Sequence, residues 1–230
     1  SSEGITFDLQ VAASSGEAYR MLCAGEAEVV LLDAFGSLAA QAAGCGEVYA
    51  IAERGGITAT QGQFVTSVTR GILGVSAFFD QDFCRVDRQS LNTWIVPALR
   101  LRAAGIDPFT RLAGVVDTGD DDAVLRGVLD GTCDVGATMA GAEGDARGVE
   151  DIDRIRVIEV LPPVPNEGLV VVGHPDAGTD TLLRDLLRRY AGPLAAVVDA
   201  EGFVSPTGTE YDELQALLDS AGVDVSSMAE

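Results

Sequence analysis

The sequence predicts an α/β protein of two lobes, each a mainly parallel sheet flanked by helices. Apolar residues make up 47% of the 230 residues but aromatic residues only 6%, so Ala, Val, Leu and Ile must build the core. This composition is typical of parallel strands that helices cover on both faces. Two distant segments also repeat one order of elements, which favours two similar lobes over one continuous sheet.

The repeated order is strand, helix, glycine turn, acidic residue and strand, first over residues 5–32 and again over residues 113–138. Gly25 and Gly131 follow the two helices, where a residue without a Cβ forms a left-handed cap at little cost. Each copy is therefore predicted to form a βαβ unit with two parallel strands.

The remaining pattern alternates helices with short strands. Helices are expected at 16–24, 37–43, 92–104, 121–129, 181–190 and 211–221, and strands at 5–11, 29–32, 48–52, 83–86, 113–116, 135–138, 156–161 and 169–172. Residues 67–82 and the proline-rich residues 162–166 are predicted to cross between the lobes, so that residues 1–68 plus 166–230 form one lobe and residues 69–165 the other. Ligands of such hinged proteins lie between the lobes, near strand carboxyl ends and helix amino ends.

The charge of the chain excludes several classes of function. The formal net charge is −21, and all 15 basic residues are arginine. A surface this acidic repels nucleic acid and anionic lipid, and the lack of lysine excludes Schiff-base chemistry and a P-loop. The only histidine, His174, lies in a predicted turn, so a catalytic triad has little support. We therefore expect a binding protein with no enzymatic activity and no cofactor.

The four cysteines have no Cys-x-x-Cys spacing, and each predicted lobe contains two of them. An even count without metal-ligand spacing favours disulfides in an oxidising compartment. Cys84 and Cys133 lie at the starts of two strands that we expect to be neighbours. We predict the pairs Cys23–Cys45 and Cys84–Cys133; the alternative is four buried thiols in a cytosolic protein.

Four segments carry further motifs, in the order 82–97, 116–124, 131–137 and 165–168. The first is a strand leading to a helix start at Ser90, with Pro97 beyond it. In this order the four segments resemble motifs of the phosphate- and phosphonate-binding proteins of ABC importers. The resemblance implies a type II periplasmic-binding-protein fold, without a counterpart of the family's first strand and helix.

The same resemblance implies the partners and the location of the protein. The partners would be a small-molecule solute and the permease of an ABC importer, and we expect the protein itself to be a monomer. It would be extracytoplasmic, in the periplasm or at the cell surface, with any lipid anchor supplied by a segment outside this sequence.

The resemblance also implies that Ser90, Asn92 and Thr93 hold an anionic group of the ligand at the start of a helix. The first N–H groups of a helix lack partners within it and carry partial positive charge, so they attract anions. The alternative is that Ser90 or Asn92 only caps the helix. Asn92 and Thr93 replace a serine and a glycine of the family motif.

Three further positions complete the ligand-binding set that the resemblance implies in the first lobe. Asp33 and Phe35 occupy a loop where the family places an aromatic residue against the ligand, and Glu167 follows the return to this lobe. Alternatively, Phe35 packs beneath its own helix.

Asp121 stands where the family has a ligand-facing histidine, inside the acidic run of residues 120–122. Carboxylates at this position disfavour a phosphate dianion, so we expect weak binding of free phosphate and a ligand with a positive group or none. Alternatively, the run is a solvated helix start. Two other functions stay open: a sensor or scaffold without transport, and a metal-assisted enzyme using Asp117, Asp120 and Asp121. The run lacks the spacing of a calcium loop, and we predict no metal site.

Overall fold

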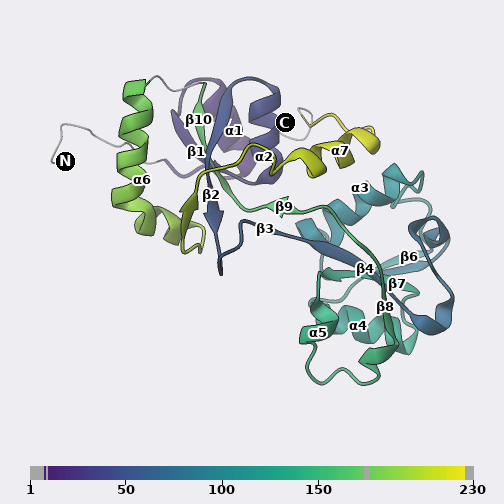
Figure 1. Cartoon of the computed structure of the whole chain (residues 1–230). Coiled ribbons are helices and arrows are strands. Elements are labelled where there is room, and N and C mark those ends of the chain that lie inside the picture. The colour runs from purple at the N-terminus through teal and green to yellow at the C-terminus, as the bar shows by residue number, and fades with distance from the viewer. Residues whose placement is uncertain (1–7, 9, 174–176, 226–230) are drawn as a thin grey trace. The chain divides into compact units, whose positions relative to one another are not determined.

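The computed structural model in Figure 1 describes residues 8, 10–173 and 177–225. The described chain forms two compact units. Unit 1 contains the residues up to Arg54, Glu167–Pro206 and Val225, and unit 2 contains Gly55–Asn166 and Thr207–Asp224. The chain therefore leaves unit 1 directly after Arg54, earlier than the crossing expected at 67–82, and part of its C-terminal region belongs to unit 2.

Unit 1 is built on a sheet of four described strands in the order β1-β10-β2-β11. Their bounds are β1 Val29–Leu32, β2 Gly46–Glu53, β10 Gly168–Val172 and β11 Gly202–Val204. Helices α1 (Ser15–Cys23) and α2 (Ala34–Ala42) pack against each other and against this sheet, and α6 (Ala177–Val197) contacts β11. Leu22, Leu32 and Val170 are fully buried where α1 meets the sheet.

Unit 2 contains a five-stranded sheet in the order β6-β5-β7-β4-β8. The bounds are β4 Gly62–Ser67, β5 Asp82–Arg85, β6 Gly114–Asp117, β7 Val135–Met139 and β8 Ile155–Val160. A second pair, β3 (Ala59–Thr60) with β9 (Val164–Pro165), joins the two stretches of chain that border unit 1.

The helices of unit 2 comprise four α-helices and several short turns of other types. The α-helices are α3 Val96–Ala103, α4 Asp121–Asp130, α5 Ala142–Asp145 and α7 Asp212–Ser220. A π-helix, η3, spans Leu91–Ile95, and the 3-10 turns are η1 Val68–Arg70, η2 Val75–Phe78 and η4 Ile152–Arg154.

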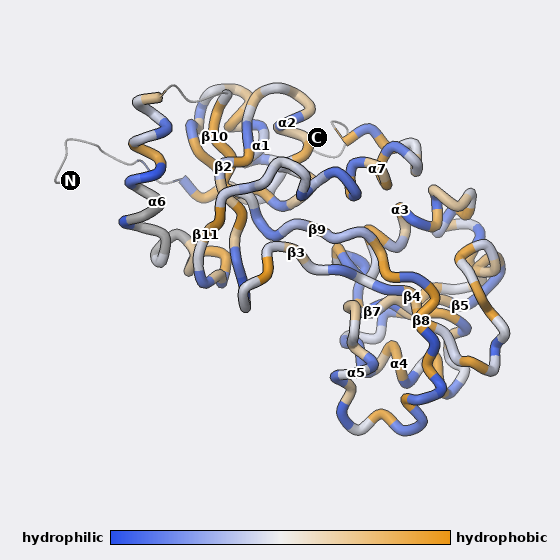
Figure 2. The backbone as a smooth tube through the Cα atoms, in the orientation of Figure 1, coloured by the Kyte–Doolittle hydropathy of each residue, from blue (hydrophilic) through white to orange (hydrophobic). Residues whose placement is uncertain are grey.

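The core of unit 2 lies on the strands of its sheet. Phe64 on β4 makes edge-to-face contacts with Phe78 and Phe83, and all three rings are fully buried. Hydrophobic residues gather around β4 and β8 in Figure 2. The strand β4, which no expected element covered, is thus central to this unit.

The prediction of mainly parallel sheets is wrong for unit 1, where every pairing between described strands is antiparallel. In unit 2, β5 pairs in parallel with β6 and β7, whereas β4 pairs antiparallel with β7 and β8. The reason is the same in both units. After the chain crosses between the units, it forms β4 in unit 2 and later β10 in unit 1. Each of these strands lies inside its sheet and runs antiparallel to both of its neighbours.

Most of the expected helices and strands are present within a few residues of their predicted ends. In the second copy of the repeat, β6 and β7 do run in the same direction, but β5 lies between them. The expected strand at 5–11 falls largely outside the described residues, as does His174. The predicted helix at 92–104 begins as the π-helix η3 and continues as α3.

Both predicted disulfides are present. Cys23–Cys45 joins the end of α1 to the turn before β2, and Cys84–Cys133 joins β5 to the turn before β7. Cys84 and Cys133 are fully buried in the core of unit 2. The expectation that the strands next to Cys84 and Cys133 are neighbours is confirmed, because β5 and β7 are paired.

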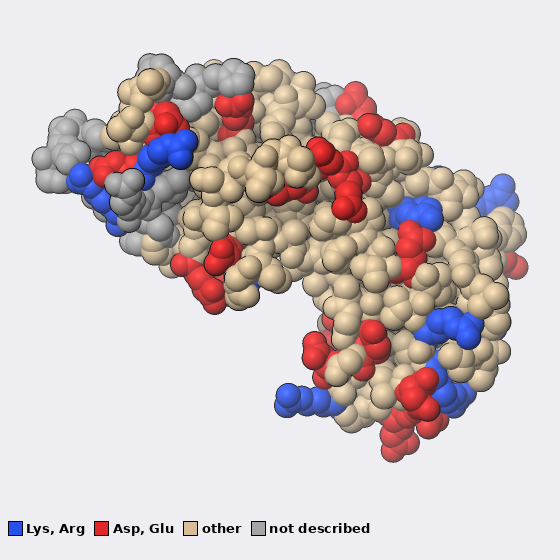
Figure 3. Space-filling view, in the orientation of Figure 1, with Lys and Arg blue, Asp and Glu red and all other residues tan. Residues whose placement is uncertain are grey.

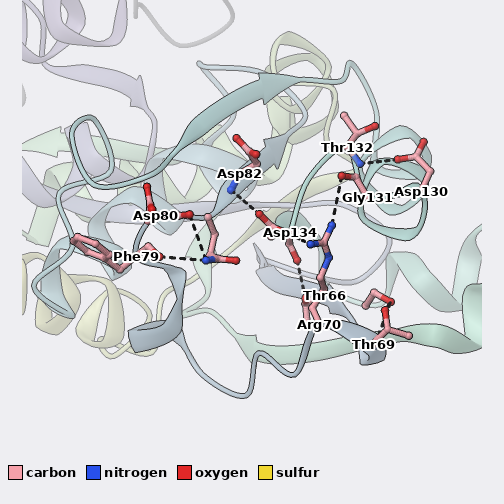
Figure 4. Close-up of polar contacts among 12 residues, drawn as sticks. Thr66, Thr69, Arg70, Phe79, Asp80, Asp82, Asp130, Gly131, Thr132 and Asp134 are labelled. Carbon is pink, nitrogen blue, oxygen red and sulfur yellow. Dashed lines mark hydrogen bonds and ion pairs between the residues drawn. The ribbon is translucent and has the colours of Figure 1, made fainter.

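Asp134, the acidic residue in the turn of the second copy, connects three strands at their ends (Figure 4). Its carboxylate accepts the N–H of Asp82 at 3.0 Å and pairs with Arg70 at 2.5 Å. The Thr66 hydroxyl donates to the carbonyl oxygen of Asp134 at 2.7 Å. These contacts lie at the amino ends of β5 and β7, so the carboxyl ends of the parallel strands stay available for a ligand.

Candidate functional site

The carboxyl ends of the parallel strands in unit 2 carry polar side chains that already have partners. Arg85, at the end of β5, donates through Nε to Asp117 Oδ1 at 2.5 Å, at the end of β6. Its guanidinium carbon also lies 4.1 Å from the ring centroid of Trp94, which is buried. Arg85 and Asp117 therefore neutralise each other at this edge of the sheet.

The helix that starts beyond β5 opens with an irregular turn. Ser90 is its N-cap, and its hydroxyl oxygen accepts the N–H of Thr93 at 3.2 Å. The N–H of Ile95 donates to the carbonyl oxygen of Ser90 at 3.0 Å, five residues back, which is π-helical winding. Pro97 follows, and its lack of an N–H removes one bond of a regular α-helix. Single π-helical turns are frequent at functional sites.

Two buried polar atoms on this turn have no hydrogen-bond partner within the described part of the chain. They are Oγ1 of Thr93, a residue that is 2% exposed, and Oδ1 of Asn92. Leaving such a group unpaired costs about 1–3 kcal/mol, so a native protein that keeps one usually has a use for it. The other end of the Asn92 amide is paired, because Nδ2 donates to Thr60 Oγ1 at 2.7 Å.

Asp121 is held at the end of β7. Asp120 caps α4 by accepting the N–H of Ala123 at 2.7 Å, and Asp121 accepts the N–H of Met139 at 3.1 Å. Burial raises the pKa of the Asp121 carboxyl, an effect that the bond from Met139 opposes and the charges of Asp120 and Asp122 reinforce. The carboxyl that sequence reasoning placed against the ligand is thus bonded to the sheet and less readily ionised than an exposed aspartate.

Strand register brings the two parts of the predicted site together. Met139, which binds Asp121, lies opposite Gly62 in the pairing of β7 with β4. Gly62 in turn approaches Asn92 so closely that a Cβ there would lie 2.0 Å from the Asn92 carbonyl oxygen. The helix start at Ser90 and the start of α4 are therefore both anchored at this edge of the sheet.

The three site residues predicted in unit 1 all have structural partners. Asp33 caps α2, accepting the N–H of Gly36 at 2.8 Å, and Phe35 is 7% exposed. Glu167 forms an ion pair with Arg54 at 2.7 Å. These contacts explain why each residue is suited to its position, and the ligand-binding roles of the three stay predictions.

The match to a known family covers most of the chain. Residues 1–211 match the family described as "ABC transporter, phosphonate, periplasmic substrate-binding protein". The chain belongs to this family. The predicted resemblance is confirmed, and the chain is a solute-binding protein of the phosphonate-binding family of ABC transporters. Membership implies a small-molecule solute, a permease partner and an extracytoplasmic location.

Solved structures share the fold of this phosphonate-binding family member. XAC2383 of Xanthomonas citri bound to ATP is 21% identical, with a TM-score of 0.63, and the match covers 94% of this chain and 85% of that one. A binding protein component of an ABC phosphonate transporter from Pseudomonas aeruginosa is 14% identical, with a TM-score of 0.53 over 95% of this chain and 76% of that one. PhnD1 from Prochlorococcus marinus, in complex with methylphosphonate, is 13% identical, with a TM-score of 0.51 over 92% of this chain and 84% of that one. No curated protein matches the chain. The predicted two-lobed periplasmic-binding-protein fold is confirmed.

The residues considered for a metal-assisted reaction have separate partners in this family member. Asp117 binds Arg85, Asp120 caps its own helix, and Asp121 binds the N–H of Met139. Within the described ranges, no group of three or more His, Cys, Asp or Glu side chains is placed to hold a metal ion. The arrangement of these three carboxylates therefore gives no support to the metal-assisted alternative.

Charged side chains are dispersed on the face of the protein shown in Figure 3, with acidic and basic groups interspersed. Several arginines are paired with carboxylates, among them Arg100 with Glu159 at 2.5 Å. Such a face offers no broad basic patch for a nucleic acid. No helix in the described ranges is both long and apolar enough to cross a membrane.

Sequence reasoning missed Thr60 and Gly62, the residues that contact Asn92. The run from Gly62 to Ser67 was assigned no strand because Gln63, Thr66 and Ser67 interrupt its apolar residues. All six residues of β4 are nevertheless buried. Gln63 donates to Thr138 at 3.2 Å and to Glu143 at 2.5 Å, which satisfies its amide inside the sheet. The β-branched and aromatic residues Phe64 to Thr66 were the available signal.

Proposed function

We propose that this protein captures a small organophosphorus solute outside the cytoplasm, holds its anionic group at the π-helical turn Leu91–Ile95, and delivers it unchanged to an ABC importer permease. The observation that carries the proposal is the buried, unpaired hydroxyl of Thr93 beside the half-paired amide of Asn92. We infer no chemistry on the solute, a monomeric state and no nucleic-acid partner.

The chemistry of the turn suits an anion. A helix start presents N–H groups that have no partner within the helix and carries partial positive charge. The Thr93 hydroxyl adds a donor, and it is buried, where a hydrogen bond to a charged oxygen is stronger than in water. Ser90 supports this arrangement by accepting the N–H of Thr93, so it orders the turn while capping it.

The charge around the turn selects among anions. Asp121 lies at the same edge of the sheet, and the chain carries a net charge of −21. A free phosphate dianion meets more repulsion than a singly charged or zwitterionic phosphonate. The raised pKa of Asp121 lowers this repulsion without removing it. We therefore propose that an aminoalkylphosphonate binds more tightly than methylphosphonate, and methylphosphonate more tightly than inorganic phosphate.

Two matched threonine-to-valine substitutions test the proposal by calorimetry with these three probes. Thr93→Val removes a buried hydroxyl that has no partner, so it should leave the ligand-free protein at least as stable as before and weaken binding at least tenfold. Thr66→Val removes a buried hydroxyl that donates to Asp134, so it should cost about 1–3 kcal/mol of stability and leave affinity unchanged. If Thr93→Val binds all three probes as tightly as the wild type does, the anion site is elsewhere.

A further inference from the structure

We propose that Thr60 is a positioning residue, whose hydroxyl keeps a hydrogen bond to the Asn92 side-chain amide in either orientation, so that either end of the amide can face the ligand. This inference rests on the proposed function, in which Asn92 lies beside the anion site. Thr60 is outside the helix start and outside every segment that resembles a family motif. Its link to the site is the 2.7 Å hydrogen bond from Asn92 Nδ2 to Thr60 Oγ1.

The position of Thr60 is fixed by contacts between its strand and residues 164–166. Thr60 lies opposite Val164 in the pairing of β3 with β9. Two residues earlier, the Thr58 carbonyl oxygen accepts the N–H of Asn166 at 2.7 Å, and the Asn166 side chain donates to the carbonyl oxygen of Ile57 at 3.1 Å. Asn166 is buried. The Thr60 hydroxyl is therefore presented from a braced strand pair and not from a loose loop.

The backbone of Asn92 is restrained as well. The Asn92 carbonyl oxygen lies against Gly62, two residues beyond Thr60, at a distance that leaves no room for a side chain. Because the backbones of Thr60 and Asn92 are both restrained, the side-chain amide of Asn92 can still rotate about its last bond. That rotation exchanges the oxygen and the nitrogen.

A hydroxyl is suited to both orientations because it donates and accepts. In the structure Thr60 accepts from Asn92 Nδ2, and Oδ1 is the buried atom without a partner. If the Thr60 hydroxyl donates to Oδ1 instead, the NH2 group becomes the free end and supplies two donors. An anionic oxygen requires the second orientation, whereas a ligand donor requires the first. Thr60 thus lets Asn92 adapt to the group that binds, at no loss of its own hydrogen bond.

The first test is made without ligand. We compare the side-chain NH2 resonances of Asn92 by NMR in the wild type, Thr60→Ser and Thr60→Val. Serine keeps the hydroxyl, so its spectrum should resemble that of the wild type, whereas valine should shift these resonances and speed their exchange with water. Asn92 resonances that are unchanged in Thr60→Val would overturn the inference whatever the protein binds.

The second test measures affinity for methylphosphonate by calorimetry. Thr60→Val should weaken binding about tenfold, which corresponds to about 1.4 kcal/mol, and Thr60→Ser should bind like the wild type. In an Asn92→Ala background, Thr60→Val should have no further effect, because a positioning residue acts only through the group that it positions. Additive losses would show that Thr60 acts independently of Asn92 and would overturn the inference.

The two proposals fail in different ways. If Thr93→Val and Asn92→Ala both leave methylphosphonate binding intact, the proposed anion site is wrong. If both of these variants lose affinity while Thr60→Val keeps it, the anion site stands and the role of Thr60 is wrong.

Discussion

Gly62 and Asn92 are in backbone contact: a Cβ built on residue 62 would lie 2.0 Å from the Asn92 carbonyl oxygen and 2.9 Å from its carbonyl carbon. Gly62 begins the inner strand β4, and Asn92 belongs to the π-helical turn that carries the candidate site. Glycine is therefore required here for close approach of two backbones. The contact sets the distance between the turn and the sheet.

Gly62→Ala should destabilise the protein by about 1–3 kcal/mol, because backbone atoms must move to admit the methyl group. It should also weaken phosphonate binding, since the turn has to shift. Gly74→Ala is the control: nothing lies within 4 Å of a Cβ there, and its φ of −171° is extended. Urea unfolding and calorimetry measure the two effects. A Gly62→Ala protein as stable as Gly74→Ala would show that the two backbones are farther apart than described.

The two disulfides should contribute unequally to stability. The chain-entropy relation applied to sequence separations of 22 and 49 gives about 3 kcal/mol for Cys23–Cys45 and about 4 kcal/mol for Cys84–Cys133. Replacing each pair by alanines and measuring urea unfolding should reproduce that order, with a further loss for the buried second pair.

Thiol titration provides the control for the disulfide comparison. The denatured, unreduced wild type should contain no free thiol. Four free thiols in freshly purified protein would contradict both bridges and remove one argument for an oxidising compartment.

Asp121→Asn should stabilise the protein increasingly as the pH rises. Burial raises the pKa of Asp121 in the native state, so above the unfolded value of about 3.9 the native protein holds a proton that the unfolded chain has released. Stability contributed by this group therefore falls as the pH rises to the native pKa, and is then constant. Asparagine has no charge to bury, and its amide oxygen still accepts the N–H of Met139.

Urea unfolding of wild type and Asp121→Asn across the acidic to neutral range checks this pH dependence. Asp145→Asn, on the exposed surface of α5, is the control that removes the same charge from the protein. A stability difference between wild type and Asp121→Asn that is the same at every pH would contradict the raised pKa.

Arg54→Met should destabilise unit 1 more than Glu167→Gln does. Arg54 binds Glu167 at 2.7 Å and also donates to the carbonyl oxygens of Asp199 at 3.1 Å and of Val198, just beyond α6. A partly exposed ion pair contributes about 0–1 kcal/mol, and each further hydrogen bond lost from Arg54 removes about 0.5–1.5 kcal/mol.

Arg154→Met is the control for Arg54→Met, because Arg154 makes an exposed ion pair with Asp151 at 3.0 Å. Arg154→Met should lower the free energy of unfolding by less than about 1 kcal/mol. Equal losses in Arg54→Met and Glu167→Gln would mean that the carboxylate, and not the carbonyl groups, accounts for the role of Arg54.

The local pattern of the sequence was sufficient to predict many of the helices and strands. Helix α4 was predicted to within one residue because Asp120 caps it and Gly131 ends it in a left-handed conformation. The strand β1 was predicted with its bounds. Both cysteine pairs were predicted from the two cysteines expected in each lobe, and Cys84–Cys133 also from the expected neighbouring strands. Local pattern also placed a helix start at Ser90. The helix and strand bounds depend on residues that lie close together in the sequence, and the disulfide prediction depends on the even number of cysteines.

The order of strands depended on features that no local pattern contains. The inner strand β4 was missed because Gln63 and Thr66 are polar, and their hydrogen-bond partners lie 75 and 68 residues away in the sequence. Without those partners the same residues would be expected in a loop. The expected lobe boundary near residue 68 differs from the unit boundary after Arg54 for this reason.

The sequence by itself determined the family and the helix start at Ser90, because motifs and caps are properties of nearby residues. It also determined the two disulfides, through the even number of cysteines and their division between the two expected lobes. Only the tertiary structure decided what Asp121 and Asn92 contact. Met139 and Thr60 lie 18 and 32 residues from these partners, and only the packing of α4 and η3 against the sheet brings them within hydrogen-bond distance. Burial at that edge then changes the pKa of Asp121 and leaves Thr93 without a partner, because both effects depend on the atoms that surround a group in space.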